Sequence, residues 1–172
     1  MANDSVSSTS PEVEIRPATE AELDAILALA AQTLDHHVVG DPHVFEPVSD
    51  PAEERARFSQ MLHDTSAGVL VAILAGRPVG YAVLIVAATP SVPGLRPRRV
   101  LRVEDLGVDK EHRRAGIGRR LMDEALAQAR SKGLDAVELN VFAFNEGAIS
   151  LYQSLGYQTT SLRMRLVVSG DG

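Results

Sequence analysis

One stretch of the sequence, residues 106–118, constrains the fold of this chain more than any other. It begins with apolar residues of strand character, passes through a charged turn, and ends with Gly116 and Gly118 at the start of an amphipathic helix that we expect to reach about Arg130. The free N–H groups and the macrodipole of a helix N-terminus favour an anion, and glycine leaves room for a phosphate. A strand that leads into such a helix is therefore typical of an anion-binding site.

Basic residues surround this turn. Arg119 and Arg120 lie in the first helical turn, where a cation opposes the helix dipole, and Arg113 and Arg114 come just before it. The whole chain carries 17 basic and 23 acidic residues, for a formal net charge of −6. The positive charge is therefore local, which favours an anion bound at the turn and argues against nucleic acid as the main partner.

The composition indicates one soluble domain. With 172 residues, of which 45% are apolar and 23% charged, the chain can build a single sizeable core. It has no cysteine, so neither a disulfide nor a thiolate metal site nor a cysteine nucleophile is expected. The sequence shows no signal-peptide pattern and no apolar run long enough for a membrane span. We therefore expect a cytoplasmic protein, with a loose polar tail at 1–11 and one domain at 12–172.

The hydrophobic pattern predicts strands and helices in the order β-α-α-β-β-β-α-β-α-β. Thr19 and Glu22 form a capping-box pattern for the first helix, and the apolar run at 79–88 suits a strand buried on both faces. The expected elements are a strand near 13–15, helices at 19–36 and 52–63, strands at 69–74, 79–88 and 99–108, a helix at 116–130, a strand at 136–142, a helix at 145–155 and a last strand at 157–168.

The glycine turn fits neither of two common nucleotide-binding motifs. The third glycine of a dinucleotide fingerprint would fall at Leu121, and no Gly-Lys-Ser/Thr follows as in a P-loop. What fits is Arg-x-x-Gly-x-Gly, from Arg113 to Gly118, between a strand and a helix. This sequence resembles the acyl-CoA-binding motif of the GNAT family of N-acetyltransferases.

A second segment supports the resemblance. It runs from Asn145 through Tyr152 to Gly156 and Tyr157, and it is similar to the family's sequence of asparagine, helix, tyrosine and Gly-Tyr/Phe. With two motifs in the right order, the resemblance covers nearly the whole domain. It implies an α/β (α+β) fold with a mixed, mostly antiparallel central sheet flanked by helices. It also implies an enzyme that transfers an acetyl group from acetyl-CoA to a primary amine of a small molecule, peptide or protein, without a metal.

The resemblance also implies which residues hold acetyl-CoA. The backbone amides of the glycine turn would bind the pyrophosphate, and the strand before it would pair with the pantetheine arm like an added strand. Asn145 would contact the arm from the other side. The implied cofactor-binding residues are Leu106, Gly107, Val108, Arg113, Arg114, Ala115, Gly116, Ile117, Gly118, Arg119 and Asn145.

Two side chains are implied in catalysis. Tyr152 would lie beside the thioester sulfur, but giving its proton, with a pKa of about 10, to a thiolate of about 8.5 is uphill by about 2 kcal/mol. It therefore needs a lowered pKa, or it acts mainly by hydrogen bonding. Glu104 lies in a Glu-Asp-Leu triplet similar to that of diamine acetyltransferases, where a glutamate is a candidate base. At an ordinary pKa of about 4.3 it would work through water or by attracting the ammonium group.

Each of these residues also has a structural alternative. Tyr152 could be an ordinary core tyrosine, Glu104 a sheet residue paired with Arg102, and Asn145 the N-cap of its helix. A noncatalytic acyl-CoA-binding or sensing module on the same fold is the alternative function, and a homodimer is left open. Three segments without a readable motif are expected to bind the acceptor: the loops at 38–51 and 89–98 and the C-terminal strand. The histidines at 36, 37 and 43 predict a residue at the mouth of the substrate site rather than a metal site.

Overall fold

A computed structural model describes residues 12–64, 66–90 and 92–168 of the chain. The expected tail at 1–11 lies outside the described residues. The centre of the molecule is a five-stranded sheet in the order β1-β2-β3-β4-β5. The first four strands pair antiparallel, and the fifth is parallel to the fourth. The strands are β1 (Glu14–Pro17), β2 (Ala67–Leu74), β3 (Arg77–Ala88), β4 (Arg99–Val108) and β5 (Ala136–Leu139).

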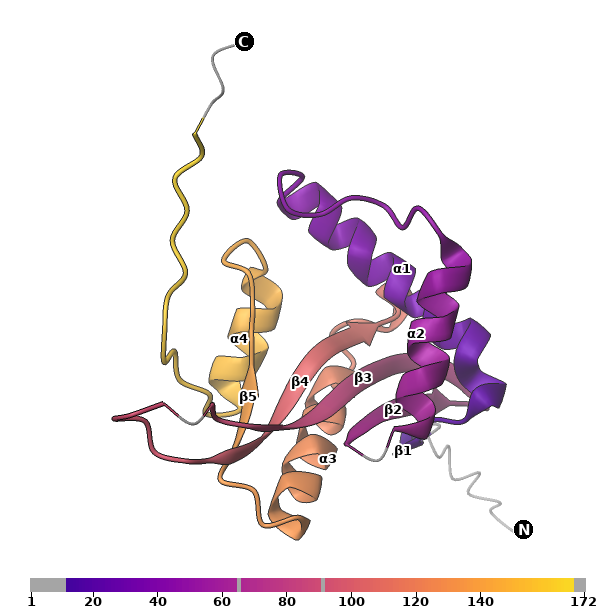
Figure 1. Ribbon diagram of the computed structural model, residues 1–172. Coiled ribbons are helices and arrows are strands. Elements are labelled where there is room, and N and C mark those ends of the chain that lie inside the picture. The colour runs from indigo at the N-terminus through magenta and orange to yellow at the C-terminus, as the bar shows by residue number, and fades with distance from the viewer. Residues whose placement is uncertain (1–11, 65, 91, 169–172) are drawn as a thin grey trace, which may run out of the picture.

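Helices cover both faces of this sheet (Figure 1). The first two pack on one face, and the last two contribute to the core on the other face. The helices are α1 (Leu23–Gly40), α2 (Pro51–His63), α3 (Ile117–Ser131) and α4 (Glu146–Ser154), with short 3-10 turns at Glu20–Glu22 and Lys110–His112. This arrangement confirms the predicted α+β fold with a mixed, mostly antiparallel sheet. Within the described residues, no helix is long and apolar enough to cross a membrane.

β3 is buried on both faces, as its continuous apolar run predicts. Tyr81 and Val83 pack with α1 and α2, whereas Ala82 and Leu84 belong to the core under α3. The change of face between neighbouring residues is the normal alternation of a strand. A single strand thereby joins two hydrophobic cores. Its pairing with β4 fixes the register of that neighbouring strand.

The start of the first helical region is tied to β1. Thr19 and Glu22 form the predicted capping box, and Arg16 donates to Glu22 at 2.8 Å. The hydrogen bond from Arg16, aided by two from Thr19, lowers the pKa of Glu22 to about 2. Because the carboxylate is favoured in the folded state, its stabilising contribution is present above the ordinary pKa of 4.5 and is lost as the pH falls towards 2.

A bulge in β4 separates it from β5. Val83 of β3 pairs with Asp105 and the next residue pairs with Val103, so Glu104 is left without an opposite residue. Pairing between β4 and β5 runs only from Val100 to Val103. Beyond the bulge, β4 keeps β3 on one side but has no described strand on the other. The last five residues of β4 therefore have no strand partner on that edge, where the carbonyl of Val108 accepts a hydrogen bond from Arg113 at 3.3 Å.

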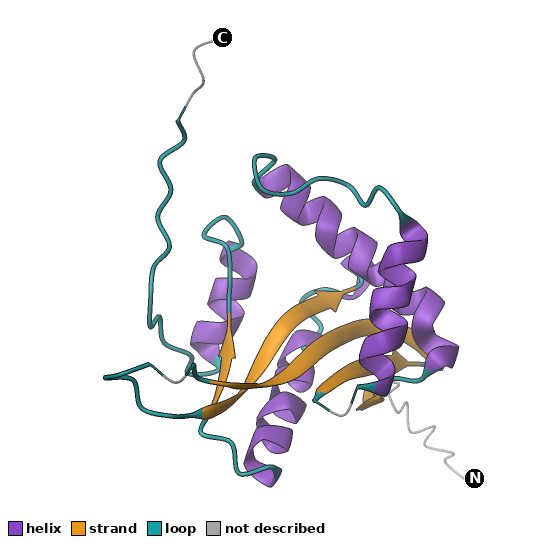
Figure 2. Ribbon diagram, in the orientation of Figure 1, coloured by secondary structure: helices purple, strands orange, loops and turns teal. Residues whose placement is uncertain are grey.

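Three predicted elements differ from the structure by more than two residues. α1 continues to Gly40 rather than ending near His36, because Pro42 is the first residue that forces the chain out of the helix. β5 ends at Leu139 rather than Phe142, because β4 turns away at the bulge. The predicted last strand at 157–168 is wrong, since these residues form a loop (Figure 2). Alternating apolar residues favour a strand, but a strand forms only where another strand lies within hydrogen-bond reach.

Candidate active site

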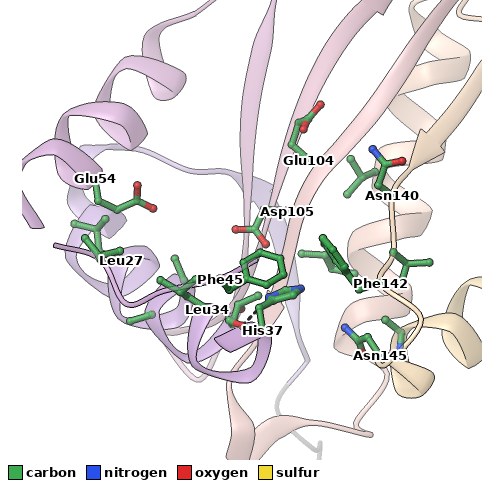
Figure 3. Close-up of a pocket in the computed structure, with 18 of the residues that line it drawn as sticks. Leu27, Leu34, His37, Phe45, Glu54, Glu104, Asp105, Asn140, Phe142 and Asn145 are labelled. Atoms are coloured by element: carbon green, nitrogen blue, oxygen red, sulfur yellow. Dashed lines mark hydrogen bonds between the residues drawn. The ribbon is translucent and has the colours of Figure 1, made fainter. Parts of the chain in front are cut away.

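A cavity of about 540 Å³ opens where β4 parts from β5. Its walls come from α1, α2, β4, α4, the loop before α2 and the segment after β5 (Figure 3). The lining residues come from three separate stretches of the chain, 27–57, 103–106 and 140–152. Leu106, from the strand before the glycine turn, meets Asn145 and Tyr152 of the second motif in this one cavity.

Asp105 lies at the centre of the cavity, between Glu104 and the rings of Phe45 and His37 (Figure 3). Its carboxylate accepts a hydrogen bond of 2.6 Å from the hydroxyl of the fully buried Tyr81. Burial raises the pKa of Asp105, and the Tyr81 hydrogen bond and the charge of Arg57 oppose part of that rise. Within the described part of the chain, Asp105 has no ion-pair partner. Sequence reasoning missed this residue, whose only signal was its place next to Glu104.

Gly107 makes the Tyr81 contact sterically feasible. A Cβ at this position would overlap the Tyr81 ring and lie 2.6 Å from the hydroxyl oxygen of Thr33. The Tyr81 ring and the Thr33 side chain fill the space beside Gly107. Gly107 therefore supports Asp105 indirectly, because it lets the Tyr81 hydroxyl reach the carboxylate.

Glu104 also lines the cavity, because the bulge brings two successive residues of β4 towards it. Its carboxylate pairs with Arg102 at 3.3 Å, and its side chain is 37% exposed. This pair is the structural alternative considered for Glu104. An exposed ion pair of this kind contributes little, so Glu104 and Asp105 have very different electrostatic surroundings despite being neighbours.

Tyr152 lies on α4, is 9% exposed and lines the same cavity. Burial, followed by the negative charge of Asp105, raises its pKa to about 12. Transfer of its proton to a thiolate of pKa about 8.5 would be uphill by about 5 kcal/mol, which favours a hydrogen-bond donor over a proton donor. The described residues offer no hydrogen-bond partner to the Tyr152 hydroxyl, which leaves it available to a ligand.

Asn145 both caps α4 and lines the cavity. Its side-chain oxygen accepts a hydrogen bond from the N–H of Ala148 at 3.2 Å and so caps α4. The same side chain lines the cavity from the side opposite β4 (Figure 3). The capping bond holds the amide in place at the cavity wall.

The glycine turn leads from β4 into α3, outside the cavity. Gly116 is the N-cap, with a left-handed φ of 81°, and a Cβ there would meet no other group within 4 Å. Arg113, Arg114 and Ala115 are exposed, whereas Ile117 is buried and can offer only its backbone. The first turn of α3 has no acidic residue and no side-chain cap. Its free N–H groups are thus open to an anion.

Some residues of the turn have intramolecular contacts that sequence reasoning did not foresee. Arg119 donates to the Ser154 hydroxyl at 2.8 Å, and Arg120 lies 3.6 Å from the Glu12 carboxylate. A Cβ on Gly118 would lie 3.1 Å from a methyl group of Leu151. The second glycine therefore allows α3 to pack closely against α4, and the first gives the turn its left-handed conformation.

The free edge of β4 lies between the turn and the cavity. Asp109 donates its N–H to the carbonyl of Val79 in β3 at 2.9 Å. Successive N–H groups of a strand point to opposite edges, so the N–H of Val108 points to the open edge. Leu106 lines the cavity from the same strand. An extended chain could pair with this edge and place its end near Asp105 and Tyr152.

Aromatic rings close the far end of the cavity. Three of the four phenylalanines of the chain, Phe45, Phe142 and Phe144, cluster around His37. Ring centroids are 4.8 Å apart for His37 and Phe45 and again for Phe45 and Phe142. The Nδ1–H of His37 donates to the carbonyl of Thr33 at 2.8 Å, which fixes the ring. His37 lines the cavity from α1, whereas the sequence predicted a loop histidine at the substrate mouth, and the phenylalanines carried no sequence signal.

Of the three segments predicted to bind the acceptor, one lines the cavity in the described part of the chain. The 38–51 loop contributes Phe45 and Val48, but no described residue of the 89–98 loop or of the C-terminal segment lines the cavity. Asp41 pairs with Arg165, and Asp50 caps α2. Local sequence could not show that these two acidic residues already had structural partners.

The sequence is similar to those of known acetyltransferases. The model of the Acetyltransferase (GNAT) family matches residues 32–157. N-acetyltransferase family 8 member 3 of Rattus norvegicus is 40% identical over 81 residues, which cover 47% of this chain and 36% of that protein. The [Ribosomal protein bS18]-alanine N-acetyltransferase of Escherichia coli K12 is 32% identical over 68 residues, or 40% of this chain and 46% of the relative. The chain thus spans less than half the length of these curated relatives.

Solved structures match over nearly the whole chain. A tetramutant of the BH1408 protein from Bacillus halodurans has a TM-score of 0.84 and 29% identity, covering 90% of this chain and 99% of that one. Aminoglycoside N-acetyltransferase AAC(6')-Iy, solved with CoA, has a TM-score of 0.73 at 18% identity, covering 95% and 98% of the two chains, and shares the fold. The family match covers both sequence motifs and every cavity wall except the start of α1. The chain therefore belongs to the GNAT family of acetyltransferases.

Proposed function

We propose that this protein transfers the acetyl group of acetyl-CoA to a primary amine by direct attack of the amine on the thioester. The observation that carries this proposal is the meeting of a partly buried carboxylate, Asp105, and an unpaired hydroxyl, Tyr152, in one cavity beside the open edge of β4. Family membership supports the reaction class, and the structural relative solved with CoA supports the cofactor.

The backbone would hold the cofactor. The open edge at Leu106–Val108 would pair with the pantetheine arm, and the amides of residues 114–119 would bind the pyrophosphate at the N-terminus of α3. The guanidinium groups of Arg113 and Arg114 add positive charge beside it. The Asn145 side chain faces the arm from α4. The pantetheine arm would thus run from the exposed pyrophosphate site at the start of α3, along β4, to the cavity. This course would place the thioester at the end of the arm inside the cavity.

The reaction needs two protons to leave the amine. An ammonium group docks against Asp105 and passes one proton to its carboxylate, directly or through a water molecule. Burial favours the neutral forms of both groups, so it raises the pKa of Asp105 and lowers that of the ammonium, and the transfer becomes less uphill. The free amine then attacks the carbonyl carbon, and the Val108 N–H stabilises the oxyanion.

Collapse of the intermediate breaks the C–S bond. The hydroxyl of Tyr152 donates a hydrogen bond to the leaving thiolate, and the thiolate takes the second proton of the former amine. Asp105 returns its proton to water. The products are an amide, CoA as the thiol, and one proton released from the original ammonium group. Tyr152 therefore acts without losing its own proton, as its raised pKa requires.

The cavity favours an amine with one positive charge and an apolar body. Of its three carboxylates, Glu54 is held by Arg57 at 2.6 Å and Glu104 by Arg102, so Asp105 alone is free for an ammonium group. Apolar side chains of α1 and the rings of Phe45 and Phe142 form the rest of the acceptor side. We propose a compact arylalkylamine or alkylamine as the acceptor, in preference to a polyamine or an aminoglycoside.

A CoA-release assay with a panel of amines tests this function. Burying a phenyl group is worth about 1.5 to 3 kcal/mol, so 2-phenylethylamine should exceed putrescine by at least about tenfold in kcat/KM. Phe142→Ala should reduce that preference more than Val92→Ala, an exposed position outside the cavity. If putrescine or an aminoglycoside is the better acceptor, the acceptor class is wrong. If acetyl-CoA binds but no amine releases CoA, the protein is the noncatalytic binding module.

A further inference from the structure

Two charged residues of α2, Glu54 and Arg57, line the acceptor cavity one helical turn apart. Two hydrogen bonds join them. The Nε–H of Arg57 donates to one carboxylate oxygen of Glu54 at 2.7 Å, and a terminal N–H donates to the other oxygen at 2.6 Å. Because both oxygens accept from one guanidinium group, the charge of Glu54 is neutralised within the cavity wall.

The guanidinium group of Arg57 is held by more than this carboxylate. Its central carbon lies 4.6 Å from the centroid of the Phe58 ring, and its third nitrogen donates to the Met61 sulfur at 3.9 Å. Phe58 is fully buried and meets the ring of Tyr81 edge-on, with 6.0 Å between the centroids. A cation over an aromatic ring is attracted to it, so these contacts keep the guanidinium group beside Glu54.

The pair is a wall that two cavities share. Glu54, Arg57 and Val48 line the acceptor cavity and also a neighbouring cavity of about 410 Å³ beside α2. Figure 3 shows the Glu54 carboxylate reaching towards the acceptor cavity from α2, with Asp105 on the strand across from it. The positive charge of Arg57 acts on Asp105, since it opposes part of the rise in the pKa of that carboxyl group. A second ammonium group on an acceptor would therefore meet a cation in this wall.

Glu54 would be a cation site if Arg57 were absent. Hydrogen bonds from Arg57 lower the pKa of Glu54, and burial opposes that change. The Glu54 side chain is 26% exposed, and within the described part of the chain it pairs with no other cation. Removal of the guanidinium group would leave a partly buried carboxylate without a partner, which an ammonium group of a ligand would stabilise.

We propose that Arg57 is a specificity-determining residue for the proposed amine acetylation, on which this role rests. Arg57 occupies an ammonium site at Glu54 and thereby restricts the enzyme to acceptors that carry a single cation. The reacting amine binds at Asp105, while the second amine of a diamine is refused by the Arg57 charge and by the occupied Glu54 carboxylate. Rejection of diamines thus comes from a repulsive group as well as from the apolar lining of the cavity.

A gain of activity tests this role. Putrescine and pentylamine have equal numbers of heavy atoms and differ in the second ammonium group, so the ratio of their kcat/KM values cancels changes common to both. Arg57→Gln frees Glu54 and should raise the ratio of putrescine to pentylamine at least about tenfold, as a charge-assisted hydrogen bond would. Glu54→Gln leaves Arg57 unpaired and should lower the ratio. In the double variant the ratio should return to within about threefold of the wild type.

Arg55→Gln is the matched control. Arg55 lies on the same helix and pairs with Asp24 at 2.7 Å, and neither residue lines the cavity. This variant makes the same change of charge and frees a carboxylate elsewhere, so the ratio should stay unchanged. An unchanged ratio in Arg57→Gln, or a gain that persists in the double variant, would overturn the role of Arg57.

The proposed function fails separately, if the wild type releases CoA with no amine. Calorimetry of the two amines in the presence of CoA then decides the role of Arg57 without turnover. Arg57→Gln should still shift the ratio of the two Kd values towards putrescine by at least about tenfold, and an unshifted ratio would overturn the proposal.

Discussion

Two neighbouring parts of β4 belong to two sites of different construction. At its C-terminal end, a free backbone edge and a glycine turn lie within residues 106–118, and few side chains are needed. At the bulge, the acceptor cavity is built from side chains of six separate segments. The first kind of site binds through peptide groups that every residue has, and the second depends on which side chains meet. A site built from backbone groups can therefore be predicted from a short sequence motif. The acceptor cavity can be identified only in the folded protein.

The largest expected effect is on the acceptor side, at Asp105. Asp105→Asn keeps the size of the side chain and an acceptor for the Tyr81 hydroxyl, but it removes the charge and the base. We expect kcat/KM for the amine to fall about 100- to 1,000-fold, with the Kd of CoA unchanged. Glu104→Gln is the matched control and should cost less than about tenfold. Steady-state kinetics measures kcat/KM, and calorimetry measures the Kd of CoA. A greater loss of kcat/KM in the Glu104 variant would assign the role of base to Glu104 and not to Asp105.

The same pair of variants has a pH signature. Activity needs the carboxylate of Asp105, so kcat/KM should rise with pH through a pKa above the ordinary 3.8, and Asp105→Asn should lose this dependence. The sign for stability is opposite. Because the folded state disfavours the charged form, stability falls as the pH rises from 3.8 through the raised pKa. Asp105→Asn should therefore be at least as stable as the wild type at pH 7 in thermal unfolding.

The next largest effect is expected at Gly107, which lies in β4 between the CoA edge and the acceptor cavity. A methyl group there would overlap Tyr81 and Thr33, so Gly107→Ala should lower the free energy of unfolding by about 1 to 3 kcal/mol and displace the Tyr81 hydroxyl from Asp105. Gly68→Ala, in a strand where a Cβ would meet nothing within 4 Å, is the control and should be neutral or stabilising. Denaturant titration of both variants checks this. Equal stability of the two would show that Tyr81 does not need the space.

A smaller effect is expected at Tyr152, where the two sides meet. Tyr152→Phe keeps the packed ring and removes the hydroxyl. A hydrogen bond to a charged group contributes about 1.5 to 3 kcal/mol, so kcat should fall at least about tenfold while the Kd of CoA stays within about twofold. Stopped-flow measurement of CoA release separates the chemical step from binding. An unchanged kcat would make Tyr152 an ordinary core residue.

The smallest effect is expected on the CoA side, where the backbone does most of the binding. Arg113→Ala with Arg114→Ala should raise the Kd of CoA by only about fivefold at low salt, since exposed charges are screened and contribute about 0.3 to 1 kcal/mol each. The difference should shrink at 1 M salt. Arg77→Ala with Arg96→Ala, an equal change of charge elsewhere on the surface, should have no effect. If the two double variants have the same Kd for CoA at low salt, Arg113 and Arg114 do not contribute to binding of the pyrophosphate.

Much of the fold follows from the sequence because its signals are local. The boundaries of β4 agree with the predicted 99–108, the capping box at Thr19 and Glu22 forms as its spacing predicts, and the buried run at 79–88 becomes the central β3. Each of these depends on a residue and its near neighbours in the chain. The glycine turn and the Asn145 helix are local in the same sense, and they were enough to indicate the family.

Only the tertiary structure decided which side chains face the acceptor. A bulge in the pairing of β3 with β4 places Asp105 in the cavity, and Tyr81, 24 residues away, keeps it hydrogen-bonded there. The rings of Phe45 and Phe142 meet because α1 and the end of β5 lie on either side of the opening. The C-terminal segment at 157–168 has a strand pattern but no strand, because pairing requires a neighbour that the pattern cannot specify. Local sequence thus determined the elements and the anion site, while long-range packing determined the acceptor cavity and the unpaired edge.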